Sequence, residues 1–127
     1  MKIFVQIAAY RDPQLIATIK SMIENATRPK NLSIGIARQF HPEDGFDDLS
    51  EYEKDKRFRI LNIPYLESKG VCWARHQVQQ VYQDEEYTLQ IDSHMRFAPN
   101  WDYEMIKMIK QLQKKGHKKP LLTGYVS

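Results

Sequence analysis

An aspartate and a histidine two positions apart end the most strand-like stretch of the chain. Residues 87–92 (YTLQID) alternate and then run apolar, as a buried strand does, and Ser93 and His94 follow Asp92. Ligands of a parallel sheet bind outside the carboxyl ends of its strands. A carboxylate oxygen with an imidazole nitrogen suits Mn²⁺ better than Ca²⁺, so Asp92 and His94 are candidate metal ligands. On spacing alone, a turn cap and a surface histidine explain the same two residues.

The rest of the chain predicts the scaffold that such a site needs. Residues 2–9 (KIFVQIAA) are nearly all apolar, as is typical of a strand buried on both faces of a parallel sheet. A helix is expected next, with Asp12 as its N-cap and Pro13 as its first residue. Strands that alternate with helices predict an α/β fold with an open, mainly parallel sheet and flanking helices. The other expected elements are strands at 31–39, 58–64, 87–92 and 121–126, a loop with one helical turn at 40–57, a helix at 70–82, and a last helix that begins after Asn100, buries Trp101, Met105, Met108, Ile109 and Leu112, and ends at Gly116.

Cationic side chains are expected at the same edge of the sheet as the Asp-x-His pair. Tyr10 and Arg11 follow the first strand, and Arg38 ends the second. Arg75 lies one turn into the second helix, near its positive N-terminal end. Arg11, Arg75 and a metal ion would together form an anion site suited to a diphosphate. The other interpretation of these arginines is ordinary surface charge.

The residues of the long loop and the single cysteine are interpreted as structural and not as part of a functional site. The acidic residues of the long loop and the histidine beside them are His41, Glu43, Asp44, Asp47 and Asp48. They are spread through a loop that contains Pro and Gly, so we expect solvated side chains rather than a metal site. Cys72 lies among apolar helix positions, which predicts a small buried hydrophobe. As the one cysteine it can form no internal disulfide, and a reducing, cytoplasmic location fits.

The size and the net charge of the chain disfavour several classes of protein. The chain has 127 residues, of which 42% are hydrophobic and 28% charged, as in one soluble globular domain. A formal charge of +3 is too small to indicate nucleic-acid binding. No apolar run is long enough for a membrane span, and the N-terminus has no signal-peptide pattern. Neither Gly-x-Gly-x-x-Gly nor a Walker A sequence occurs, which disfavours dinucleotide and P-loop sites.

Three segments of the chain resemble GT-A glycosyltransferases. They are residues 3–13 (IFVQIAAYRDP), 68–76 (SKGVCWARH) and 89–105 (LQIDSHMRFAPNWDYEM). The resemblance is to the GlcNAc-transferase family that includes cytoplasmic UDP-GlcNAc:hydroxyproline polypeptide transferases. The polypeptide N-acetylgalactosaminyltransferases are more distantly similar, and share the Asp-Ser-His strand end and a Gly-x-x-x-Ala-Arg helix.

The resemblance implies a role for each matching residue. Mn²⁺, or Mg²⁺, would bind the Asp-x-His pair together with the diphosphate of a UDP-sugar, and the uridine would lie at the end of the first strand. The nucleotide-sugar-binding residues would be Ala9, Tyr10, Arg11, Arg38, Arg75, Asp92 and Ser93, and the metal ligands Asp92 and His94. The implied reaction transfers GlcNAc to a hydroxyl of a polypeptide or glycan acceptor, with retention of configuration.

The same resemblance implies that residues 1–127 are the nucleotide-binding half of a longer fold. The acceptor half and the catalytic residues would then follow Ser127, and an exposed sheet edge would allow self-association. Two alternatives remain open. One is a sugar-phosphate nucleotidyltransferase, although residues 8–13 lack the usual glycines. The other is a non-catalytic nucleotide-binding or interaction module.

Overall fold

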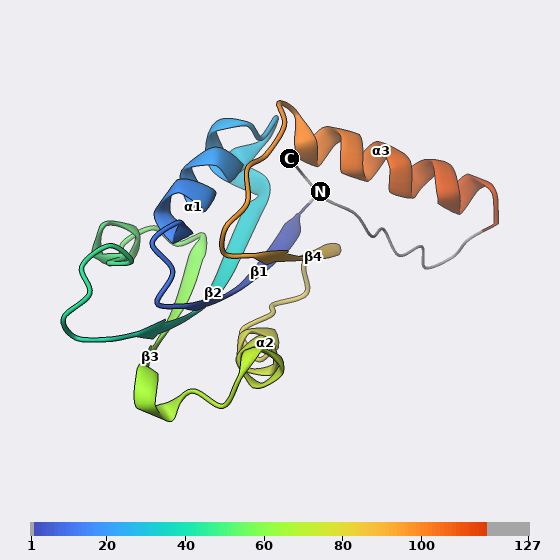
Figure 1. Cartoon of the computed structure of the whole chain (residues 1–127). Helices are drawn as coiled ribbons and strands as arrows, with labels where there is room; N and C mark the ends of the chain where they lie inside the picture. The colour runs from blue at the N-terminus through green and yellow to red at the C-terminus, as the bar shows by residue number, and fades with distance from the viewer. Residues whose placement is uncertain (1, 117–127) are drawn as a thin grey trace.

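Four strands form the centre of the structure, a computed structural model that describes residues 2–116 (Figure 1). The strands are β1 (Ile3–Tyr10), β2 (Leu32–Phe40), β3 (Phe58–Pro64) and β4 (Tyr87–Asp92); the helices are α1 (Leu15–Glu24), α2 (Val71–Gln79) and α3 (Trp101–Lys114); and short 3₁₀ turns occupy Pro29–Asn31, Ser50–Tyr52 and Tyr65–Glu67. The bounds predicted for β3 and β4 are confirmed, and β1 and β2 lie one residue later than expected. The strand predicted at 121–126 lies outside the described residues.

All four strands are parallel, in the order β3-β2-β1-β4. Ile7 of β1 is paired with Ile36 of β2 on one side and with Ile91 of β4 on the other. This open parallel sheet with flanking helices confirms the expected α/β class and is consistent with a Rossmann-like fold. Because every strand runs in the same direction, the carboxyl ends of β1 and β4 are neighbours although the two strands are far apart in the sequence.

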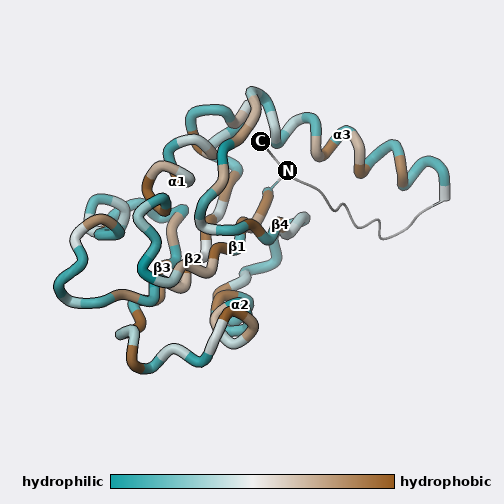
Figure 2. The backbone as a smooth tube through the Cα atoms, viewed as in Figure 1, coloured by the Kyte–Doolittle hydropathy of each residue, from teal (hydrophilic) through white to brown (hydrophobic). Residues whose placement is uncertain are grey.

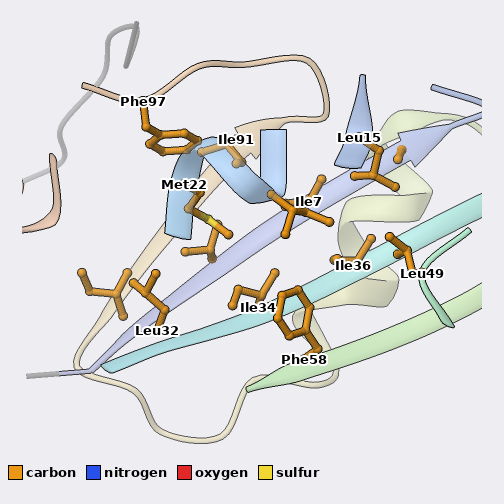
Figure 3. Packing of buried hydrophobic residues seen from close by; sticks show 14 of the residues in the cluster. Ile7, Leu15, Met22, Leu32, Ile34, Ile36, Leu49, Phe58, Ile91 and Phe97 are labelled. Carbon is orange, nitrogen blue, oxygen red and sulfur yellow. The ribbon is translucent and has the colours of Figure 1, made fainter. Parts of the chain in front are cut away.

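The larger core lies between the sheet and α1. Every second residue of β1 from Ile3 to Ala9 points into it, as the two-residue period of a strand requires. Leu15 and Met22 of α1 meet these side chains, and Phe97 closes the cluster after β4 (Figure 3). Burial of this apolar face stabilises the fold by roughly 25 cal/mol per Å².

The other face of the sheet packs on α2. Phe4 of β1 and Ala37 of β2 meet Ala74 and Val78 of the helix, and all four side chains are fully buried. This smaller cluster sets the position of α2 against β1 and β2. The three helices therefore lie on both faces, with α2 opposite α1 (Figure 1).

The helix ends differ in part from the expected ones. The first helix begins at Leu15 rather than at Pro13, because Asp12 forms a turn in which its carboxylate accepts the Gln14 N–H. Asn100 does precede α3, but in a left-handed conformation with no side-chain cap. Gly116 follows the C-cap of α3 with a positive φ of 96°, which confirms its predicted place.

Two residues predicted to be buried are exposed. Cys72 lies on the solvent side of α2, whose inward face uses Ala74 and Val78 instead, so the interpretation of Cys72 as a buried hydrophobe was wrong. Met108 of α3 is also exposed. The reason is that α3 packs on the core through its first turns and then extends past the sheet (Figure 1).

Hydropathy follows the layers of the fold. Figure 2 shows hydrophobic residues along the central strands and mostly hydrophilic ones in the connecting loops. Within residues 2–116, none of the helices has the length and apolar character needed to cross a membrane.

Candidate functional site

The carboxyl end of β4 carries an exposed carboxylate that faces a cation. Asp92, the last residue of β4, points to the α2 side of the sheet, and its Oδ1 lies 3.6 Å from Nη2 of Arg75. Both side chains reach solvent, at 55% exposure for Asp92 and 33% for Arg75. The structure thus brings together two residues that sequence analysis placed at one site.

Asp12 connects the end of β1 to the segment after β4. Its Oδ1 accepts the Gln14 N–H at 2.8 Å, its Oδ2 accepts the Ser93 hydroxyl, and the same Oδ2 lies 3.2 Å from Nδ1 of His94. Partial burial alone would raise the pKa of Asp12, but the hydrogen bonds from Ser93, Gln14 and His94 outweigh it and hold that pKa below its ordinary value. Asp12 is therefore an ionised acceptor at neutral pH.

Thr18 of α1 anchors the same segment from the core side. Its hydroxyl donates to the Ser93 carbonyl at 2.8 Å and accepts the Met95 N–H at 2.9 Å. Ser93 is buried, so its hydroxyl is directed to Asp12 rather than to solvent. His94 stands between these anchored residues and is itself 65% exposed.

A pocket of about 240 Å³ lies at the end of β1, beside the N-terminus of α2. Its lining residues are Ala8, Tyr10, Gln39, Ser68, Gly70 and Val71. Gln39 organises it, since its amide donates to the Ala9 carbonyl at 3.1 Å and accepts the Ser68 hydroxyl. Tyr10 is exposed at the rim, whereas the Ala9 side chain is buried on the opposite face and only its backbone reaches this edge.

Arg11 turns away from the Asp92 side of the edge. It has a positive φ of 47°, and its guanidinium binds the Asp44 carboxylate through Nε at 2.7 Å and Nη2 at 3.3 Å. The Arg11 guanidinium lowers the pKa of Asp44 through this hydrogen bond. The arginine that was expected to bind a diphosphate is thus paired with a carboxylate of the 40–57 loop.

Arg38 likewise binds the loop. It donates to the Asp47 backbone carbonyl through Nε at 2.5 Å, to the Asp47 carboxylate at 3.4 Å, and to Asn62 at 2.9 Å. Arg38 shares the face of β2 that bears Ile36, and so lies across the sheet from α2 and Arg75. The expectation of solvated loop acids holds for Glu43 and Asp48, which are exposed. It was wrong for Asp44, whose side chain is largely buried against Arg11, and for Asp47, which is completely buried beside Arg38.

The expected residues therefore form two groups. Arg75 and Asp92 lie together, with Ser93 and His94 next in the chain and held by Asp12. Arg11 and Arg38 are each paired with the loop. Sequence reasoning placed residues 67–70 at this edge of the sheet but overlooked Gln39 as a lining residue. The only sequence signal for Gln39 was a polar residue near the end of an apolar strand.

Asp92 and His94 are the two candidate ligands for a metal ion. Within residues 2–116, no three or more His, Cys, Asp or Glu side chains are grouped so that they could hold a metal ion among themselves. Asp92 and His94 nevertheless have the right donor atoms and are exposed, and a bound diphosphate could supply further oxygens. Asp12 lies on the Nδ1 side of the His94 ring, so Nε2 is the ring nitrogen that does not take part in this contact.

A larger cavity of about 440 Å³ lies at the opposite, amino edge of the sheet. Ile3, Arg28 and Ile106 contribute to it, with a row of α3 lysines at its margin. It is distant in the fold from the carboxyl ends of the strands, and none of the expected site residues lines it.

The fold and its polar carboxyl edge define a Rossmann-like α/β protein. The sequence model of the family described as Glycosyltransferase (GlcNAc) matches residues 2–56 and 46–127, two overlapping segments that span almost the whole chain. The chain therefore belongs to this GlcNAc glycosyltransferase family, and sugar transfer is the activity that the family supports. Among curated proteins, none matches the chain.

Proposed function

We propose that this chain binds the UDP-sugar donor of a metal-dependent glycosyltransferase at the carboxyl ends of β1 and β4. The observation that carries the proposal is the exposed Arg75–Asp92 pair, 3.6 Å apart at the end of a parallel strand in a member of a glycosyltransferase family. Ligands of open α/β sheets bind outside such strand ends. A cation and a carboxylate at this position can share the recognition of a metal-bound diphosphate.

Asp92 and His94 are the residues that would hold Mn²⁺ or Mg²⁺. The ion, when bound, would offset the negative charge that develops on the departing UDP. Arg75 would donate hydrogen bonds to the diphosphate oxygens from the first turns of α2. The pocket beside Tyr10 would receive the uridine, since an exposed phenol ring can stack on a base and the Gln39 amide lies beneath it.

The proposed reaction is transfer of GlcNAc to an acceptor hydroxyl. The bond between the anomeric carbon and the UDP oxygen breaks, a bond from the acceptor oxygen to that carbon forms, and the hydroxyl proton leaves. The product would be α-linked. In this proposal the described residues bind and orient the donor.

The test is calorimetry of UDP and UDP-GlcNAc with and without Mn²⁺, above about pH 7. We expect Mn²⁺-dependent binding that Asp92→Asn abolishes with the fold intact, because an amide is a poorer metal ligand than a carboxylate. Glu86→Gln is the matched control. This exposed acid lies just before the other end of β4, so its substitution should leave UDP binding unchanged. Equal affinity of wild type and Asp92→Asn would remove the metal assignment.

A further inference from the structure

We propose that Asp12 is a positioning residue that holds the His94 ring with its proton on Nδ1 and its Nε2 lone pair free for the cation. This inference rests on the proposed function, because it concerns how a proposed metal ligand is prepared. A histidine that binds metal through one ring nitrogen commonly donates the other N–H to a carboxylate, which fixes the tautomer and the ring orientation. Asp12 has the chemistry and the position for that task.

The contact between the two side chains determines the direction of the hydrogen bond. Asp12 Oδ2 lies 3.2 Å from His94 Nδ1. An ionised carboxylate can only accept, and a neutral imidazole has one N–H, so a hydrogen bond here places the proton on Nδ1. The carboxylate side chain is 14% exposed and the imidazole 65%, so the far side of the ring faces solvent.

Asp12 can orient the ring because both of its carboxylate oxygens are themselves held by hydrogen bonds. The Gln14 N–H binds Oδ1, and the Ser93 hydroxyl binds Oδ2 beside the imidazole. Hydrogen bonds to both oxygens favour the ionised form and prevent rotation of the carboxylate. The backbone on either side of His94 is fixed by Thr18 through Ser93 and Met95.

Asp12→Asn should reverse the tautomer with little change of shape. The Gln14 N–H can only donate and needs an oxygen at the Oδ1 position, whereas the Ser93 hydroxyl can rotate and accept. The new NH₂ group therefore takes the Oδ2 position, which faces His94. That group can only donate, and the imidazole must then accept at Nδ1 and carry its proton on Nε2. The lone pair that would meet the cation is lost, although His94 and Asp92 are both still present.

The experiment combines ring-nitrogen NMR with a binding measurement on the full 127-residue chain. Nitrogen shifts of ¹⁵N-histidine, recorded without metal at about pH 8 and assigned with His94→Gln, report which nitrogen carries the proton. We expect the Nδ1–H form in wild type and the Nε2–H form in Asp12→Asn. We also expect Asp12→Asn to weaken Mn²⁺-dependent UDP binding by about 10- to 100-fold.

Asp48→Asn is the matched control. Asp48 also accepts the N–H two residues later, from Ser50 at 3.0 Å, so the same substitution is made in the same kind of turn but outside the site. The positioning role is overturned if wild type has its His94 proton on Nε2, which needs no variant and no metal. It is equally overturned if Asp12→Asn binds UDP and Mn²⁺ as tightly as wild type. Absence of Mn²⁺-dependent binding in wild type would instead refute the proposed function on which it rests.

Discussion

Arg75 and Asp92 form an exposed ion pair that contributes little to the stability of the fold. Their atoms are 3.6 Å apart and both side chains are solvated, and exposed pairs of this kind contribute less than about 1 kcal/mol to stability. A solvated cation beside a carboxylate can therefore exchange its partner for a ligand at little cost. This contrasts with Arg38, whose guanidinium must stay with the buried Asp47.

Arg75→Ala tests the role of this arginine. We expect the variant to weaken UDP binding by roughly tenfold or more, in keeping with the 1.5–3 kcal/mol of a charged hydrogen bond, and to weaken uridine binding much less. The reason is that Arg75 is proposed to meet the diphosphate alone. Calorimetry with both ligands measures the difference, and Arg28→Ala is the control because Arg28 is exposed at the opposite edge of the sheet. Equal losses for UDP and uridine would contradict the assignment.

At the scale of elements, α2 is set close to the sheet by a glycine. A Cβ on Gly35 of β2 would lie 2.7 Å from Cζ of Phe4 and 2.9 Å from Cγ1 of Val78. Gly35 therefore allows α2, and Arg75 on it, to approach the sheet as closely as it does. The requirement is one of space, because the contact atoms belong to buried side chains of β1 and α2.

Gly35→Ala should consequently destabilise the protein by about 1–3 kcal/mol, the usual cost of overpacking a core. Gly45→Ala is the matched control, since a Cβ at Gly45 would contact nothing within 4 Å and its stability should be nearly unchanged. Urea unfolding followed by circular dichroism compares the two variants. A Gly35→Ala protein as stable as wild type would show that α2 can move outward without loss.

At the scale of the whole molecule, α3 is joined to the rest of the chain at its first turn. Asp102 is buried, and its carboxylate accepts the backbone N–H groups of Thr27 and Arg28 at 2.6 and 2.9 Å. The Trp101 indole donates to the Met22 carbonyl at 2.8 Å. These bonds tie the end of α1 to the chain segment that follows the Asp-x-His pair, and so hold the candidate site to the core.

Asp102→Ala should lower the free energy of unfolding by roughly 2–3 kcal/mol, because two N–H groups lose a charged acceptor. Glu104→Ala removes an exposed acid from the same helical turn and should cost much less. Thermal or urea unfolding of both variants gives the comparison. Similar losses for the two would mean that charge near the start of α3, rather than these two bonds, is what matters.

Local patterns in the sequence were sufficient for the elements and for the class of fold. The two-residue period of the strands and the helical spacing between them are properties of neighbouring residues, so β3 and β4 were located to the residue. The polar residues at the strand ends could be assigned to one edge because parallel strands share their carboxyl side. Arg75, near the start of the helix after the third strand, was expected at the same edge as Asp92, and the structure places the two side chains 3.6 Å apart.

Only the tertiary structure determined which partners these residues have. Asp12 and His94 are 82 residues apart, and they meet because the strand order puts β1 beside β4. Asp47 was predicted to be a solvated loop residue, but the loop packs against β2 and Asp47 is buried beside Arg38. Cys72 looked buried because helical spacing does not say which side of a short helix faces the sheet. The physical reason is the same in each case: periodicity is a local property, whereas pairing and burial depend on chain segments that the fold alone brings together.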